Sequence, residues 1–435
     1  MSLRFGYGTN GFANHRLDDA LAVIAELGYA GVALTLDHAH LDPFQPYLLK
    51  QVDAVATALH HHGLAVVIET GARYLLSPRR KHAPTLLDDD ADVRIDFLRR
   101  AIDIAADLEA EAVSFWSGVS TVDRWDRLVS GCAAVVEHAG RRGVKLGFEP
   151  EPGMVVDTIE RWARLREDLG APPEFGLTLD IGHCRAVEPH DVPDCVRLAG
   201  PHLVNVQIDD MRRGVHEHLE FGEGEIDFPP VLAALAEAGY TGLVAVELPR
   251  HSHDAPGVAA RSIGFLRAAD WVGRCLTAIA KDPQQITVLF PAVRRHVGRE
   301  RADDARVRLL AAAPEWAEEL YRYGDNDEKR AVLLGLPAID DTGRHVELLH
   351  DALRSNDTRL ISAALGPYSA HLDPAAWRHG VLKAVFMGLH LSTVHDLDRR
   401  ADAELGRMLD GLHREREAAR RTMPADALAL KERLI

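Results

Sequence analysis

Short apolar runs alternate with longer amphipathic stretches from residue 3 to about residue 268. The runs are rich in β-branched and aliphatic residues, which is typical of buried strands. Between them lie helical patterns such as LDDALAVIAELGY and PPVLAALAEAGY, several of which end at glycine. The pattern predicts strands over residues 3–9, 31–36, 65–69, 112–116, 145–149, 176–180, 203–207 and 243–247.

Eight strand–helix units within this length have the size and rhythm of a (β/α)8 barrel. A doubly wound open sheet would also alternate strands and helices, but no GxGxxG motif follows the first strand. We therefore expect an α/β fold in which residues 1–268 form a TIM barrel.

The strand pattern fades beyond about Trp271. Helical patterns such as RADDARVRLLAAAPEWAEELYRYG and ADAELGRMLDGLHREREAARR follow one another, broken by proline, glycine and aspartate. This pattern predicts an all-α helical domain over residues 269–435.

Composition narrows the classes of function. The formal charge of −16 comes from 66 acidic and 50 basic residues, which disfavours nucleic acid and anionic membranes as partners. A small anionic substrate is still compatible, since a few local arginines can bind it. The four cysteines form no CxxC pair, the start of the chain lacks a signal pattern, and no apolar run reaches membrane length. We expect a cytoplasmic protein without a membrane span.

Four polar residues end the last four predicted strands: Glu149, Asp180, Gln207 and Glu247. Strand ends of a parallel barrel meet at one rim, so these side chains are expected to converge. Three carboxylates and an amide oxygen suit a hard divalent cation such as Mg²⁺ or Mn²⁺. The alternative is that such residues are solvated strand ends or helix caps, and Gln207 is the weakest of the four as a ligand.

Glu149 and Glu247 are the expected catalytic pair. One carboxylate could remove a carbon-bound proton while the other returns one, with a metal-stabilised enediolate between the two steps. An isomerase moves the proton to the neighbouring carbon, whereas an epimerase returns it to the other face. The sequence leaves both open, together with dehydration or lyase chemistry that begins with the same abstraction.

Other polar residues near the strand ends are expected to bind substrate. His183 follows Asp180 in a DIGH motif, and a polar loop with adjacent arginines follows Gln207. The spacing of His216 and His218 would also suit zinc, but no cysteine or third histidine stands nearby in the sequence. The expected substrate-binding residues are Glu69, Arg73, Trp116, His183, Arg212 and His218, with rim packing or a solvated loop as the alternative.

At GFEPEPG, DIGH, NVQIDD and AVELPR the first half resembles the sugar phosphate isomerase/epimerase family of xylose isomerase-like TIM barrels. The resemblance implies a divalent metal held by Glu149, Asp180, Gln207 and Glu247. Many relatives have histidine where this chain has Gln207, while hydroxypyruvate isomerase-like members also use glutamine. The resemblance therefore implies metal binding and leaves the substrate class open.

The second half resembles an EboA domain through LGPYSAHLDPAAWRHGVLKAVFMG and HREREAARRTMP. That resemblance implies association with bacterial clusters that handle or traffic secondary metabolites. Our leading interpretation is a metal-dependent isomerase or epimerase of a small keto-sugar, polyol or hydroxy acid, in secondary metabolism. The rival is a metabolite-binding or trafficking protein with a catalytically degenerate barrel. A protein partner of the helical domain and self-association are both left open.

Overall fold

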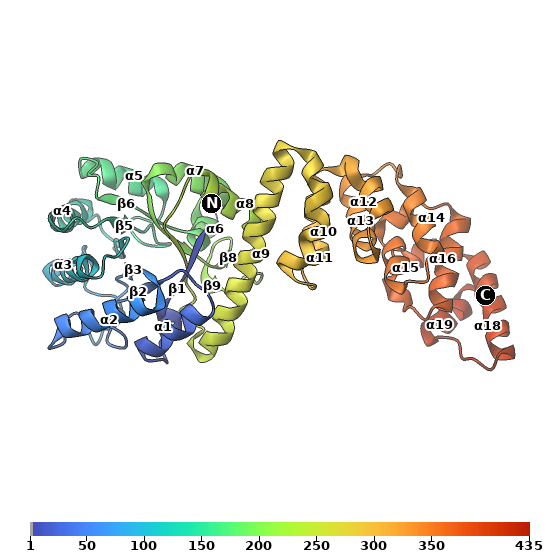
Figure 1. Cartoon of the computed structure of the whole chain (residues 1–435), viewed down its shortest axis with the longest axis horizontal. Coiled ribbons are helices and arrows are strands. Elements are labelled where there is room, and N and C mark those ends of the chain that lie inside the picture. The colour runs from blue at the N-terminus through green and yellow to red at the C-terminus, as the bar shows by residue number, and fades with distance from the viewer. Residues whose placement is uncertain (1–2) are drawn as a thin grey trace. The chain divides into compact units, whose positions relative to one another are not determined.

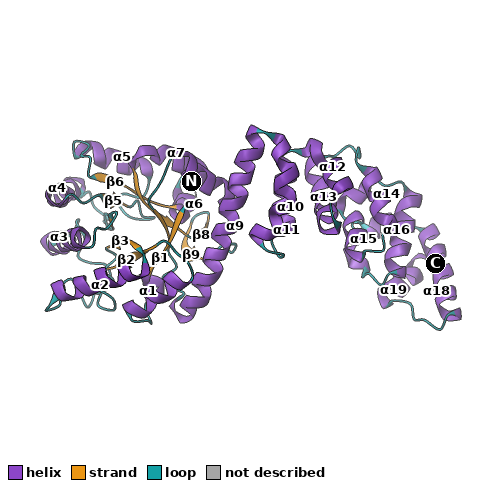
Figure 2. Cartoon of the chain, viewed as in Figure 1, coloured by secondary structure: helices purple, strands orange, loops and turns teal. Residues whose placement is uncertain are grey.

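Eight parallel strands close into a barrel in the computed structural model, which describes residues 3–435. Their order around the ring is β1-β10-β7-β6-β5-β4-β3-β2. Figure 2 shows these strands inside a ring of helices. The predicted TIM barrel is confirmed, and each predicted strand agrees with the observed one to within one residue at either end. The barrel strands are β1 (Arg4–Gly8), β2 (Gly31–Thr35), β3 (Ala65–Glu69), β4 (Val113–Phe115), β5 (Leu146–Phe148), β6 (Phe175–Asp180), β7 (Leu203–Ile208) and β10 (Leu243–Val246).

The ring closes where the first strand pairs with the last, with Tyr7 opposite Val246. All the ladders are parallel, so every strand ends at the same rim. Asp180 lies opposite Gln207 in the β6–β7 ladder. The polar residues that end these strands therefore lie next to one another.

Most buried apolar side chains of the first unit form one cluster of strand and helix residues. Because the strands are covered on both faces, they are apolar almost throughout rather than alternating. An aromatic cluster runs across neighbouring strands, with ring centroids of Phe115 and Phe148 5.1 Å apart and those of Phe148 and Phe175 5.6 Å apart. This packing gives the strand ends a rigid support.

Helices follow the strands and cover the barrel (Figure 1). Two of them, α2 and α4, end at a glycine in the left-handed conformation, Gly63 and Gly143. The helices of this part are α1 (Leu17–Glu26), α2 (Leu48–His62), α3 (Ala91–Asp107), α4 (Trp125–Arg142), α5 (Ile159–Asp168), α6 (Ile181–Val187), α7 (Val192–Ala199), α8 (Phe228–Glu237) and α9 (Ala255–Lys281).

The chain divides into two compact units, Met1–Gly273 and Arg274–Ile435. The division falls within α9. A domain boundary between residues 268 and 269 stays a prediction.

The second unit is helical, as predicted, and none of its residues, all of which are described, lies in a strand. The aspartates that interrupt its sequence cap its helices: the side chains of Asp357, Asp373 and Asp402 each accept a backbone N–H of the following turn. The helices are α10 (Ile286–Val297), α11 (Ala302–Ala312), α12 (Ala317–Tyr323), α13 (Asn326–Ile339), α14 (Val346–Arg354), α15 (Thr358–Ala364), α16 (Pro374–Phe386), α17 (Leu397–Arg400), α18 (Ala403–Ala418) and α19 (Ala425–Leu434).

The polar segment after β7 is not a loop, as the sequence suggested, but a β-hairpin. Its strands are β8 (Asp210–Arg212) and β9 (Val215–Leu219), and Arg212 pairs with Val215. The connecting turn contains Gly214 with a φ of 72°, a conformation that glycine adopts without strain. A search of the described part of the chain for a helix both long and apolar enough to cross a membrane found none.

Candidate metal centre and rim pocket

A cavity of about 490 Å³ opens at the rim where the strands end, and we call it the rim pocket. Most of the residues that the sequence singled out line it, although they come from widely separated parts of the chain. Those residues are Glu69, Arg73, Trp116, Glu149, His183, Gln207, His218 and Glu247.

Among the described residues, several buried oxygen atoms at this rim lack a hydrogen-bond partner, and Oδ2 of Asp180 and Oε1 of Gln207 are two of them. An unpaired buried polar atom costs about 1–3 kcal/mol, so such atoms usually have a ligand. One ligand atom each of Asp180, His218 and Glu247 lies within 4.8 Å of the others. Glu149 falls in another group of candidate ligands, with Glu151 and His183, so a single metal site formed by Glu149, Asp180, Gln207 and Glu247 stays a prediction.

Asp180 is held by the helix that follows it. It is the N-cap residue of α6, and its Oδ1 accepts a hydrogen bond of 2.8 Å from the backbone N–H of His183. The cap fixes the carboxylate at the end of β6. Its other oxygen, Oδ2, is left free to bind a ligand.

Glu247 follows β10 directly and is held by a residue from the opposite end of the barrel sequence. Asn10, in the short 3-10 helix Thr9–Phe12, donates a hydrogen bond of 2.9 Å from Nδ2 to Oε1 of Glu247. Glu149 follows β5, and its Oε1 lies 3.6 Å from Nδ1 of His183. Two strands, β6 and β7, separate the strands that carry these glutamates.

Burial sets the protonation of both glutamates. Burial, reinforced by the negative charge of Glu151, raises the pKa of Glu149 well above its usual value. Burial likewise raises the pKa of Glu247, although His218 opposes the shift. Raised values bring carboxyl groups closer to the pH range in which they can both take and give a proton.

Glu69 ends β3 at the floor of the same pocket. Its Oε1 accepts a hydrogen bond of 3.2 Å from Nδ2 of Asn205 in β7. Burial and the charge of Glu247 raise the pKa of Glu69 well above its usual value. Glu69 is thus a third buried carboxyl group beside the catalytic candidates.

The loop between β3 and α3 carries Arg73 to the pocket, together with Lys81 and His82. Arg94 of α3 is buried and ties this loop down, donating to the carbonyl oxygens of Thr70 at 3.1 Å, His82 at 2.6 Å and Pro84 at 2.8 Å.

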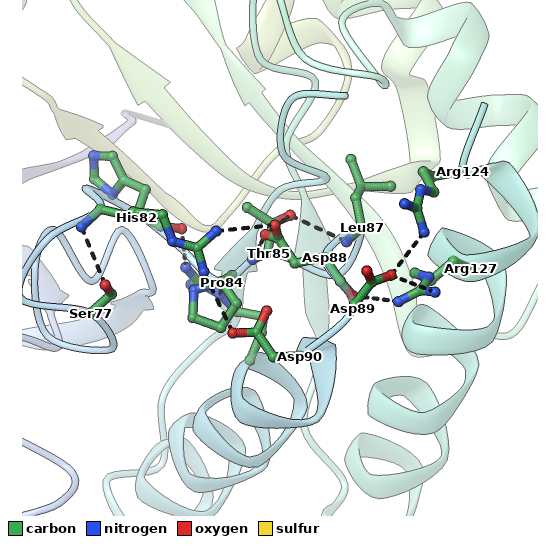
Figure 3. Close-up of polar contacts among 12 residues, drawn as sticks. Ser77, His82, Pro84, Thr85, Leu87, Asp88, Asp89, Asp90, Arg124 and Arg127 are labelled. Carbon is green, nitrogen blue, oxygen red and sulfur yellow. Dashed lines mark hydrogen bonds and ion pairs between the residues drawn. The ribbon is translucent and has the colours of Figure 1, made fainter. Parts of the chain in front are cut away.

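The far end of the loop is fixed by aspartates (Figure 3). Asp88 Oδ2 accepts a hydrogen bond of 2.7 Å from the backbone N–H of Thr85. Oδ1 of Asp89 lies 3.0 Å from Nη1 of Arg124, the residue before α4, and 3.0 Å from Nη2 of Arg127 in α4. These contacts make a long connection into a fixed wall of the pocket.

The β8–β9 hairpin also carries His216 and His218 to the pocket. Asp210 anchors it, because its carboxylate accepts hydrogen bonds from the backbone N–H groups of Gly222, Gly224 and Ile226 at 2.8, 3.0 and 3.1 Å. This anchor explains Gly224 in the GEGEID stretch of residues 222–227, because a Cβ at that position would overlap the carboxylate of Asp210. The hairpin is therefore fixed at its base.

His218 is paired with Asp209, whose carboxylate bonds its Nδ1. Burial opposes the charged imidazole, but Asp209 outweighs it and raises the pKa of His218 to about 10. Gly182 of the DIGH motif makes room for this pair, since a Cβ there would overlap Oδ1 of Asp209.

Arg212 does not reach the rim pocket. It ends β8, is exposed, and donates a hydrogen bond of 2.8 Å to the carbonyl oxygen of Glu223. The hairpin register directs the neighbouring Arg213 to backbone oxygens of α6 and Glu188 instead. Neither arginine lines the cavity with His218, so the expectation that Arg212 binds substrate there has no geometric support.

Sequence reasoning missed several residues of the site. Asn10 stands in the GTNGF segment after the first strand, Glu151 two residues after Glu149, and Asp209 in the QIDD motif. Lys81 and His82 lie in a loop with no regular pattern. A polar residue directly after the first strand was the one signal in the sequence that pointed to Asn10.

Comparison with known proteins agrees with this geometry. Residues 21–269 match the family model described as xylose isomerase-like TIM barrel, and residues 311–430 match the model described as metabolite traffic protein EboA. The structure of an L-ribulose 3-epimerase superposes with a TM-score of 0.52 at 21% identity, covering 64% of this chain and 97% of that one. The structure of the 3-keto-D-glucoside 4-epimerase YcjR from E. coli gives 0.50 at 16% identity, covering 61% and 99%. These likenesses show the fold.

Curated sequences give the same picture. The L-ribulose-5-phosphate 3-epimerase UlaE of Shigella flexneri serotype 5b is 28% identical over 218 residues, which are 47% of this chain and 73% of that protein. The uncharacterized protein MJ1311 of Methanocaldococcus jannaschii is 31% identical over 166 residues, or 35% of this chain, and the match spans just over half of that relative, 56%. With the family model covering more than half of its residues, the chain belongs to the family of xylose isomerase-like TIM barrels.

Proposed function

We propose that the barrel is a divalent-metal-dependent isomerase or epimerase of a small keto-sugar, polyol or hydroxy acid. The observation that carries the proposal is the pair of buried glutamates, Glu149 and Glu247, which line one pocket from strands that two others separate. The similarity to a ribulose-phosphate 3-epimerase supports it.

Glu149, Asp180, Gln207 and Glu247 would hold the ion. When bound, the ion would supply positive charge that polarises the carbonyl oxygen of a substrate and so acidifies the adjacent C–H bond. The unpaired Oδ2 of Asp180 and Oε1 of Gln207 support this assignment.

The two glutamates would move the proton. The deprotonated carboxylate of one takes a proton from the carbon beside the carbonyl, and the protonated carboxyl of the other delivers a proton to the opposite face or to the neighbouring carbon. Burial raises the pKa of both carboxyl groups above the usual value, so each binds a proton more tightly than an exposed glutamate does. Asn10 orients Glu247 through its hydrogen bond to Oε1.

The charge of the pocket wall bears on the substrate class. Arg73 and Lys81 line the pocket together with the hairpin histidines, and their cationic heads suit a phosphate or a carboxylate. This arrangement supports a substrate with an anionic group at one end.

Hydrogen exchange with solvent deuterium tests the proposal. Each of Glu149→Gln and Glu247→Gln should abolish deuterium incorporation into a converted sugar while the sugar still binds, because the amide keeps the shape of the side chain and cannot transfer the proton. Wild-type rates of exchange in both variants would refute the paired-glutamate mechanism. Product analysis of the wild type then separates epimerisation, isomerisation and loss of a β-hydroxyl group by a dehydratase or lyase route.

A metabolite carrier is the second candidate, and the match of residues 311–430 to a metabolite traffic protein favours it. In this case the barrel would bind a metabolite of secondary metabolism and the helical unit would engage a protein partner. Recovery of an unchanged small molecule from the purified chain, with no deuterium exchange into it, would support the carrier.

A further inference from the structure

The carboxylate of Glu69 reaches across the interior of the barrel. Glu69 ends β3, and three strands separate β3 from β7 in either direction around the ring, so β3 and β7 face each other. Oε1 of Glu69 nevertheless accepts a hydrogen bond of 3.2 Å from Nδ2 of Asn205 in β7. Both residues are buried. The carboxylate therefore lies against the inner face of β7.

The same face of β7 carries Gln207. It lies two residues after Asn205, and alternate residues of a strand share a face. Burial and the charge of Glu247 raise the pKa of Glu69, and hydrogen bonds to its carboxylate oppose that rise. The side chains of Asn205 and Gln207 both make such bonds. A hydrogen bond that lowers the pKa of a carboxyl group is one donated to its ionised form, so the amide of Gln207 donates to Glu69.

A glutamine side chain has two unlike ends. Its carbonyl oxygen can bind a cation, whereas its NH2 group cannot. Because the NH2 group of Gln207 is bonded to Glu69, the oxygen is directed elsewhere. Oε1 of Gln207 is buried and lacks a hydrogen-bond partner among the described residues. Glu69 thus leaves the oxygen, and not the nitrogen, free to bind a ligand at the rim.

A buried polar layer holds Glu69 in place. Nδ2 of Asn205 also donates a hydrogen bond of 3.4 Å to Oγ1 of Thr178, and Thr178 donates one of 3.0 Å to Oγ of Ser114. Ser114 lies opposite Glu69 in the β3–β4 ladder. Gly147 gives this layer its space, since a Cβ there would overlap Oγ1 of Thr178. The partner of Gln207 therefore has a fixed position.

We propose that Glu69 is a positioning residue that orients the amide of Gln207, so that its oxygen faces the proposed divalent cation. The inference rests on the proposed function, which places Gln207 among the ligands, and it goes beyond the substrate contact expected of Glu69. A carboxylate behind a metal ligand fixes the orientation of that ligand, and its loss weakens metal binding about 10–100-fold. An amide ligand depends on such a partner especially, because only one of its ends binds a cation.

Mn²⁺ titration of the full chain, stripped of metal with a chelator, tests the proposal. Free Mn²⁺ is followed by electron paramagnetic resonance, so no turnover is required. Glu69→Leu removes the acceptor and should raise the dissociation constant for Mn²⁺ about 10-fold or more. Glu69→Gln keeps an oxygen acceptor and should recover most of the affinity. Gln207→Glu presents two equivalent oxygens, so Glu69→Leu added to that variant should not weaken Mn²⁺ binding further.

Glu111→Gln is the matched control. Glu111 is a carboxylate beside the first residues of β1 and β10, where it pairs with Arg4 at 2.6 Å and accepts the backbone N–H of Leu243 at 3.2 Å. This variant should leave the dissociation constant within about 2-fold of the wild-type value, even where it lowers the melting temperature. Equal Mn²⁺ affinity in Glu69→Leu and the wild type would overturn the proposal. An equal loss in the Gln207→Glu background would also overturn it, because the effect would then be structural.

Deuterium exchange measured on the same samples reports on the proposed function separately. Mn²⁺ binding that depends on Glu69 as described, without exchange into any sugar, would refute the isomerase or epimerase and keep the positioning role. Exchange by the wild type together with Glu69-independent Mn²⁺ binding would do the reverse. A wild-type chain that binds no Mn²⁺ would overturn both.

Discussion

The side chain of Asn10 donates a hydrogen bond of 2.9 Å to Oε1 of Glu247, joining residues that follow the first and the last strand of the barrel. This bond fixes a carboxylate that we propose to be catalytic. It also connects two segments that are 237 residues apart. The orientation of Glu247 therefore depends on closure of the ring between β1 and β10.

Removal of the Asn10 amide should slow proton transfer without removing the metal. A hydrogen bond to a charged group contributes about 1.5–3 kcal/mol, so Asn10→Ala should lower the rate of deuterium exchange about 10-fold or more. Metal content, measured by plasma mass spectrometry, should stay at the wild-type level. An unchanged exchange rate would mean that Glu247 is held by other contacts.

Asp180→Asn should separate the structural and the metal-binding roles of Asp180. Asparagine keeps a side-chain oxygen for the N-cap bond to His183, so the melting temperature without metal should stay close to that of the wild type. The lost charge should weaken Mn²⁺ binding about 10-fold or more. Asp180→Ala is the comparison, since it should lose both the cap and the ion. Equal Mn²⁺ affinity in Asp180→Asn and the wild type would contradict the assignment of this ligand.

Stabilisation by metal should grow as the pH rises. The pKa values of Glu149 and Glu247 are raised by burial, so the folded protein without metal retains their protons more tightly than the unfolded chain does. Their contribution to stability is complete below the unfolded pKa of about 4.3 and is lost as the pH rises through the folded values. Metal binding needs the ionised forms and follows the opposite trend.

Thermal melts with Mn²⁺ and with chelator, compared at acid and at neutral pH, measure this dependence. The difference in melting temperature between the two conditions should be larger at neutral pH. Glu247→Gln, which cannot ionise, should show a flatter dependence. A difference that shrinks toward neutral pH would argue against carboxylate ligands.

Arg94 should be a major determinant of stability in the loop before α3. Its guanidinium bonds three carbonyl oxygens, which would be left unpaired in Arg94→Lys, at a cost in unfolding free energy of about 3 kcal/mol or more. The exposed Arg100, which pairs with Asp96 on the same helix, is the control, and Arg100→Lys should change the free energy by less than about 1 kcal/mol. Denaturant unfolding measures both.

Two arginines near the rim should differ in their effect on substrate binding. Arg73 lines the pocket, whereas Arg212 is turned toward the carbonyl oxygen of Glu223. Arg73→Ala should raise the KM for an anionic sugar about 10-fold or more, while Arg212→Ala should leave it within about 2-fold. The reverse order would place the anionic group over the hairpin.

The sequence was sufficient for the barrel because its strands are continuous apolar runs that end at polar residues. Glu149, Asp180, Gln207 and Glu247 could be located because a closed parallel barrel brings all strand ends to one rim. The β8–β9 hairpin was not predictable, since its strands are short and largely polar, like the solvated loop for which it was taken.

The closeness of His183 and His216 was hidden in the sequence for a related reason. His183 and His216 are 33 residues apart, and only the folding of the hairpin onto α6 brings their rings together. The same is true of Asn10, whose partner is near the other end of the barrel sequence. Contacts that depend on which way a hairpin folds leave no periodic signal in the chain.

Pairing of the first strand with the last has a consequence for synthesis of the protein. A growing chain that has not yet released Glu247 from the ribosome lacks one of the proposed glutamates, one of the oxygen ligands and the partner of Asn10 at the same time. We therefore expect the proposed proton transfer only from chains whose synthesis has passed the final strand.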